Sequence, residues 1–181
     1  TRSGVLILTA DSTYSGGTTI GTGATLQLGN GGASGLIAGD VVNNGTLRFA
    51  RSDAATMAGA ISGSGGLQVQ SGSLILTGNS SYTGATTIAA GATLQLGNGG
   101  GVGSMTSDVA NAGTFAFNGA GALAYGGVIS GNGLIRQIGS GVTSLTGDAS
   151  GFTGATQVQA GVLSVHGKLG GTLTVLAGGQ L

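Results

Sequence analysis

The 181-residue chain contains no cysteine, no proline and no tryptophan, and glutamate is also missing. Without cysteine the chain has neither disulfides nor thiolate metal ligands, and it could cross a membrane unfolded without a disulfide hindering it. The absence of proline suits an extended sheet in which nearly every backbone N–H is hydrogen-bonded. It also means that the 42 glycines do not indicate collagen, because no G-X-Y period accompanies them.

Charge is scarce at 6% of residues, with five cations, five anions and a net charge of zero. Five scattered cations cannot form the basic stripe that nucleic acids require, and they are too few for attachment to anionic membranes. The longest aliphatic run, at 5–8, is far too short for a membrane-spanning helix. We therefore expect no nucleic-acid partner and no direct membrane insertion. Because there is no initial methionine and no signal peptide, we interpret the sequence as a segment of a longer chain.

What the sequence does contain is aliphatic residues in alternation with small or polar ones. Hydrophobic residues make up 40% and the mean hydropathy is +0.39, which argues against disorder. Alternation predicts strands at 25–28, 46–49, 67–70, 74–77, 93–96 and 114–117. Asn-Gly pairs, which favour tight turns, begin at Asn30, Asn44, Asn98, Asn118 and Asn132.

A long internal repeat organises these strands. The segment 6–32, LILTADSTYSGGTTIGTGATLQLGNGG, recurs at 74–100, so that Leu6 corresponds to Leu74, and a third copy begins near Ser144. Faithful repeats of this kind indicate a stacked solenoid. We predict one single segment over 1–181, with units at about 6–73, 74–143 and a partial 144–181.

Shorter periods within the unit predict its fold. The sequence numbers of Leu26, Leu47, Leu67 and Leu94 increase by 21, then by 20, then by 27. These intervals predict an all-β fold, a right-handed parallel β-helix with about three coils per 68-residue repeat. The longer third interval predicts an excursion from the third coil at 74–82.

Stacking of these coils predicts which side chains meet in the interior. Equivalent residues of adjacent units would lie roughly 14 Å apart, because coils stack at about 4.8 Å. Tyr14, Tyr82 and Phe152 therefore should not stack on one another, although they align in sequence. The expected stacks are Leu26, Leu47, Leu67, Leu94 and Phe115, and beside them Leu28, Phe49, Val69, Leu96 and Phe117.

The repeat text resembles a known family. The segment 74–97 follows the pattern Leu-Thr-Gly-x-x-x-Tyr-x-Gly-x-Thr-x-Ile and then Thr-Leu-x-Leu-Gly, and the segment 6–29 follows it with Ala10 in place of the first glycine. A looser match at 145–165 has an extra residue near Gly151 and Phe152 in place of tyrosine. This pattern resembles the passenger-associated transport repeat of bacterial autotransporters. The resemblance implies a surface-exposed or secreted Gram-negative passenger, drawn across the outer membrane by its own C-terminal β-barrel translocator, which is absent from this sequence.

Candidate catalytic residues are few and scattered. His166 has Ser164 nearby and Asp148 in the preceding segment. A catalytic triad needs a nucleophile and a carboxylate held around the histidine, and nothing here resembles a nucleophile elbow. We therefore interpret His166 as an exposed strand residue. Asp40 and Asp108 each precede a valine, and we expect each to accept a local backbone hydrogen bond at a turn. Paired carboxylates for glycoside cleavage are not indicated, since these two lie three coils apart.

Other motifs also read as structural. Arg48, Arg51 and Asp53 are the densest charge group, interpreted as a solvated salt-bridge patch. The glycine-rich stretch 97–101 precedes no helix and so is no phosphate loop, and Gly167-Lys168 lacks the following Ser or Thr of a Walker motif. The adjacent threonines at 18–19 and 86–87 should point to opposite faces, unlike an ice-binding array. The sequons at 44–46 and 79–81 are interpreted as turn chemistry.

We therefore predict a non-enzymatic stalk segment with no catalytic, cofactor-binding or metal site. It would support folding, translocation and surface presentation of the passenger. One alternative is an adhesin that binds host glycan or protein or self-associates, with Asn79 to Tyr82 as the candidate surface. The second alternative is a β-helical polysaccharide-degrading enzyme.

Overall fold

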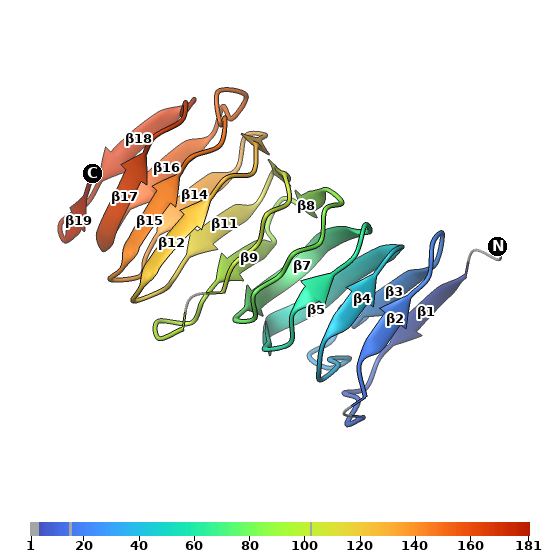
Figure 1. The fold of residues 1–181 in the computed structure, drawn as a ribbon. Helices are drawn as coiled ribbons and strands as arrows, with labels where there is room; N and C mark the ends of the chain where they lie inside the picture. Colours follow the sequence, from blue (N-terminus) through green and yellow to red (C-terminus); the bar gives the residue numbers. More distant parts are fainter. Residues whose placement is uncertain (1–3, 15, 102) are drawn as a thin grey trace.

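The structure is a computed structural model that describes residues 4–14, 16–101 and 103–181, and this part of the chain is built of strands and turns. All strand pairs recorded in it are parallel, and each pairs with a strand about one coil further along the chain. The longest path through the main sheet runs through nine strands, β1-β3-β5-β7-β9-β11-β14-β16-β18. The fold is thus a parallel β-solenoid of about nine coils, and the predicted all-β stacked architecture is confirmed (Figure 1).

Each coil has three faces, which the chain visits in the order A, B, C. Face A contains β1 (Val5–Leu8), β3 (Thr25–Leu28), the first halves of β5 (Thr46–Met57) and β7 (Gly66–Leu76), β8 (Thr86–Ile88), β10 (Val109–Asn111) and β13 (Ile129–Ser130). Face B contains the second halves of β5 and β7, then β9 (Thr93–Leu96), β11 (Thr114–Phe117), β14 (Leu134–Gln137), β16 (Ala155–Val158) and β18 (Thr172–Val175). Face C contains β2 (Thr18–Ile20), β4 (Val41–Asn43), β6 (Ile61–Ser62), β12 (Ala122–Tyr125), β15 (Val142–Leu145), β17 (Gly161–Val165) and β19 (Gly179–Gln180).

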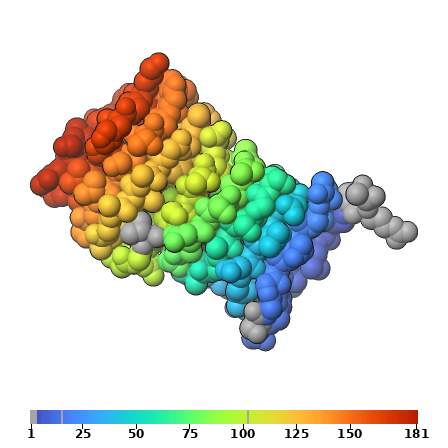
Figure 2. Space-filling model, viewed as in Figure 1, coloured from blue at the N-terminus to red at the C-terminus, as the bar shows by residue number. Residues whose placement is uncertain are grey.

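Alternation along each strand builds a continuous apolar interior. Leu47, Leu67, Leu74, Leu94 and Phe115 are fully buried, and the strand neighbours of the four leucines are only partly buried. Each such side chain contributes about 1.5–3 kcal/mol through burial. Figure 2 shows the sequence colours as successive bands along an elongated body, as expected when each coil packs only on its neighbours.

The predicted interior stacks are correct within each repeat and wrong at the junction between repeats. Leu26 pairs with Leu47, and Leu47 with Leu67, as expected. Leu67, however, pairs with Thr86 on β8, whereas Leu94 pairs with Leu74 on β7. The predicted excursion at 74–82 is therefore also wrong in its first part, because Leu74 to Leu76 are ladder residues at the end of β7.

The long step from Leu67 to Leu94 has a simple structural origin. It comprises one full coil, from Leu67 to its ladder partner Thr86, and one additional face, from Thr86 to Leu94. Elsewhere a single coil separates such positions, as between Leu6 and Leu26 or between Leu26 and Leu47. A 68-residue repeat therefore makes about three and one-third coils. Each repeat ends one face further round the solenoid than it began.

Equivalent strands consequently change face from one repeat to the next. The first-repeat strands β2 and β3 lie on faces C and A, and their second-repeat counterparts, β8 and β9, lie on faces A and B. The loosely matching third copies, β16 and β17, lie on faces B and C. The repeat is thus rotated by about one third of a turn at each copy, because an apolar alternation that fits one face fits all three.

Candidate functional site

The main departures from the three-faced frame are loops that come in pairs on successive coils. Counting described residues only, a loop pair consists of 9–17 without 15 and 29–40 in the first repeat, of 77–85 and 97–108 without 102 in the second, and of 146–154 and 166–171 in the third. They take the place of a strand on faces B, C and A respectively, and several project beyond the shaft in Figure 1. Loops held by a rigid scaffold are the usual carriers of recognition, so these pairs are the candidate functional surface.

A buried arginine holds the first loop pair together. Arg51 is only 4% exposed, and it donates to both carboxylate oxygens of Asp53, at 2.9 and 3.0 Å. Its Nη2 also donates to the carbonyl of Ala33 at 2.6 Å, and its Nη1 donates to Asp11 at 3.3 Å. The expected salt bridge between Arg51 and Asp53 is present, and the Asp53 side chain is 39% exposed. The expectation of a solvated patch is wrong for Arg51, since loop residues from elsewhere in the sequence cover it.

Asp11 is the other anchor of this pair. Its Oδ1 accepts the backbone N–H groups of Gly35 and Leu36, both at 2.8 Å, so the shorter loop holds the longer one. The backbone N–H groups of Leu36 and Gly35 hold the pKa of Asp11 below its usual range, and Arg51 adds to this effect. The hydrogen bond from Arg51 likewise lowers the pKa of Asp53, while Asp53 raises the pKa of Arg51.

A chain of hydroxyl groups holds the second loop pair. The Tyr82 hydroxyl lies 2.7 Å from Thr86 Oγ1, which lies 2.8 Å from Ser107 Oγ, and Tyr125 donates to the Ser107 carbonyl at 2.6 Å. All four side chains are buried, and burial raises the pKa of both tyrosines. The expectation that Tyr82 offers an exposed aromatic for adhesion is wrong, because its ring is fully enclosed.

In each repeat an aromatic residue precedes a threonine by four positions, but the hydrogen bonds differ. Tyr14 and Thr18 are also 2.7 Å apart, but Tyr14 is 43% exposed. In the third repeat Phe152 occupies the tyrosine position, and the buried hydroxyl of Thr156 has no hydrogen-bond partner among the described residues. We call the buried hydroxyl contacts of Tyr82, Thr86 and Ser107 the Tyr82 clasp. Among the described residues, this complete set of contacts is found in the second repeat.

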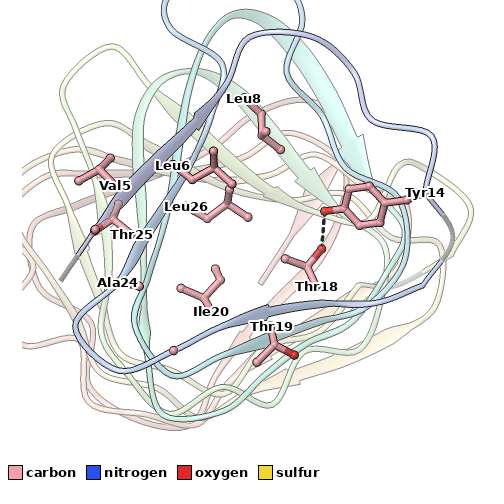
Figure 3. Close-up of a pocket in the computed structure, with 12 residues that line it drawn as sticks. Val5, Leu6, Leu8, Tyr14, Thr18, Thr19, Ile20, Ala24, Thr25 and Leu26 are labelled. Carbon is pink, nitrogen blue, oxygen red and sulfur yellow. Dashed lines mark hydrogen bonds between the residues drawn. The ribbon is translucent and has the colours of Figure 1, made fainter. Parts of the chain in front are cut away.

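Tyr14 lines an apolar cavity of about 420 Å³ at the first described coil. Figure 3 shows Leu6, Leu8, Ile20 and Leu26 converging inside the ribbon ring, while Thr19 points away from it. No charged residue of the described chain lines this cavity. It is the open interior of the solenoid rather than a pocket equipped for chemistry.

The residues considered for catalysis do not assemble into a triad, because Asp148 does not join His166 and Ser164. His166 is exposed, one residue beyond β17, and its Nδ1 lies 3.5 Å from Ser164 Oγ. Asp148 instead accepts the backbone N–H of Ser150 at 2.8 Å, and hydrogen bonds from Ser150 lower the pKa of this carboxyl. Among the described residues no three His or Asp side chains gather as metal ligands.

Asp40 and Asp108 do bind backbone N–H groups, but not the local ones expected. Asp40 accepts from Ala60 and Asp108 from Val128, both at 2.8 Å and both one coil further along. Each carboxylate thus joins two coils at a corner, which sequence spacing cannot distinguish from a turn within one coil. The two lie in different repeats and form no catalytic pair.

Several smaller expectations can be checked in the described chain. Thr18 and Thr86 turn inward while Thr19 and Thr87 are exposed, so the opposite-face prediction is confirmed. Asn44 Oδ1 accepts the Ser64 N–H at 3.2 Å, in keeping with a structural role at its corner. The described residues include no helix, so none that could cross a membrane.

Comparison with known proteins agrees with the repeat structure. The family model described as passenger-associated-transport-repeat matches residues 3–28, 68–96 and 135–165. A relative from Brucella suis biovar 1 (strain 1330), named adhesin BmaC autotransporter, is 36% identical over 159 residues, which is 76% of this chain and 5% of the relative. The chain thus spans a small fraction of that protein. No solved structure matches.

The three matched segments coincide with the equivalent ladders of the solenoid. They cover β1 to β3, most of β7 to β9, and β14 to β17. Together with the relative, they imply export across the outer membrane to the cell surface. The chain belongs to the autotransporter passenger family built from passenger-associated transport repeats.

Proposed function

We propose that this segment is a non-enzymatic stalk of the passenger, which supports its folding and translocation and holds other regions away from the cell. The carrying observation is the parallel ladder that continues from β1 to β18. Because each coil is hydrogen-bonded mainly to its neighbours, coils can add one at a time as the chain emerges. The 1–181 segment, with the units given above, would attach through the rest of the parent protein to its own translocator.

Removal of residues 6–73 from the full-length parent tests this role. The deletion removes one repeat and joins equivalent ladder positions, so the apolar alternation continues across the junction. A stalk should still be exported and resist protease, and it should be shorter by about 16 Å, or three and one-third coils at about 4.8 Å each. Loss of cell or ligand binding with normal export would contradict a purely mechanical role.

An adhesive surface is the second candidate, favoured by the loop pairs and by the relative named as an adhesin. Thr13, Asn30 and Asn98 are exposed on these loops, whereas Thr87 is exposed on a flat strand. Thr13→Arg, Asn30→Arg and Asn98→Arg should then reduce binding, while Thr87→Arg should not. Equal binding by all four variants at equal surface display would count against adhesion through the loops.

A further inference from the structure

The five Asn-Gly pairs of this chain differ in their susceptibility to deamidation, a spontaneous chemical modification. In such a pair the glycine backbone nitrogen can attack the asparagine side-chain carbonyl carbon, closing a succinimide ring and expelling ammonia. Water then opens the ring to aspartate or isoaspartate. The glycine nitrogen must be free to move onto the side chain, so a hydrogen bond that holds its N–H in place opposes the reaction.

Four of the five glycine N–H groups are held by a hydrogen bond. Gly31 donates to the Ala50 carbonyl at 2.8 Å, Gly99 to that of Asn118 at 2.7 Å, and Gly133 to that of Asn111 at 2.9 Å. In the fourth pair, the Gly45 N–H donates to the Asn43 side-chain oxygen at 3.2 Å. The three contacts to backbone carbonyls come from the stacked fold and are lost when the chain unfolds.

The pair Asn118-Gly119 is the exception among the described residues. Neither the Gly119 N–H nor the Asn118 carboxamide has a hydrogen-bond partner there, and the Asn118 side chain is only half-buried. Gly119 is itself buried, so its N–H is set apart by the missing partner and not by exposure. The preceding coil contacts both backbone polar groups of Asn118, since its N–H donates to Leu96 at 2.8 Å and its carbonyl accepts from Gly99. We propose that Asn118 is the preferred deamidation site of the folded protein.

Modification at this position would affect the second loop pair. Isoaspartate adds a methylene to the backbone, and this moves the Asn118 carbonyl away from the Gly99 N–H that it accepts from loop 97–108. Either product also adds a negative charge to a shaft whose net charge is zero. Deamidation therefore loosens one loop of the second pair as the protein ages, while the Tyr82 clasp beneath it stays in place.

Ageing the folded chain at mildly alkaline pH, followed by peptide mass spectrometry, tests the proposal. Non-tryptic digestion is needed because the chain has only five Lys and Arg residues. Asn118 should deamidate several-fold faster than the other four sites in folded protein, and this lead should disappear in urea. Faster modification at any other Asn-Gly pair, or an unchanged lead in urea, overturns the proposal.

Two further measurements separate this mechanism from simple loop mobility. The Gly119 amide should exchange with deuterium faster than those of Gly31, Gly99 and Gly133, and equal protection overturns the assignment. Ageing should increase protease cleavage in loop 97–108 of the parent chain, which carries Asn118. Asn118→Gln, which retains the carboxamide but closes a less favourable ring, should remain resistant over the same period, and equal cleavage in both overturns the link to the loop.

Discussion

Replacing two equivalent threonines by valine should change stability in opposite directions. Thr86 and Thr156 are both fully buried on inward positions, and each follows an aromatic residue by four positions. Thr86 Oγ1 bonds to Tyr82 and Ser107, whereas Thr156 Oγ1 has no partner in the described part of the chain. Valine has nearly the shape of threonine, so the substitutions differ mainly in the hydrogen bonds that they remove.

The expected magnitudes follow from the cost of an unpaired buried hydroxyl. Thr156→Val removes such a group and should stabilise the fold by about 1–2 kcal/mol. Thr86→Val leaves the hydroxyls of Tyr82 and Ser107 without their shared partner and should destabilise it by about 1–3 kcal/mol. Phe152→Tyr should stabilise in the Thr156 background by restoring the clasp, by about 0.5–1.5 kcal/mol for the new hydrogen bond.

Urea denaturation followed by circular dichroism measures these changes, with the parent chain as reference. Phe152→Tyr in a Thr156→Val background serves as the matched control, because the new hydroxyl then lacks its acceptor and should give no gain. The reasoning is refuted if Thr156→Val is as destabilising as Thr86→Val. It also fails if Phe152→Tyr stabilises equally with and without the Thr156 hydroxyl.

Three other predictions concern the core, the first loop pair and the rotation between repeats. Leu94→Asp buries an unpaired carboxylate and should cost several kcal/mol, which protease resistance and surface display of the parent would report. Because the folded-state pKa of Asp11 is depressed, its carboxylate stabilises the first loop pair fully above its unfolded pKa of about 3.9, and this stabilisation is lost as pH falls through the lower folded value. Hydrogen exchange should therefore show loop 29–40 opening in acid before loop 97–108. Simultaneous opening of the two loops would contradict this prediction. Cysteines at Gln68 and Thr87, which are ladder partners on adjacent coils, should form a disulfide on oxidation. Cysteines at Gln68 and Gln95 should not, and the opposite result would restore the stack that spacing alone suggested.

Much of the fold was predictable because local patterns carry it. Alternation around Leu26 and Leu47 places their side chains inside wherever the strand lies, and the near-identity of the segments 6–32 and 74–100 indicates stacking. The turn residues and the absence of proline follow from the same backbone requirements. The stack from Leu26 to Leu67 was correct for this reason.

The loop anchors were not predictable in the same way. Arg51 meets Asp11 and Ala33 across separations of 40 and 18 residues, and in the second repeat Gly119 stands at the corresponding position. Tyr82 looked available for binding because its surroundings in sequence are polar and glycine-rich. In the structure Met105 of the next coil contacts the Tyr82 hydroxyl, and Ser107 of that coil contacts its partner Thr86.

The sequence by itself therefore determined a repetitive all-β solenoid, its inward side chains and its family resemblance. Only the tertiary structure decided that one repeat makes about three and one-third coils, so that each repeat places its loops on a new face. The physical reason is that an alternating strand has an inside and an outside but no preference among three faces. The choice of face is made by the length of chain between strands and by the coil on which each strand comes to lie.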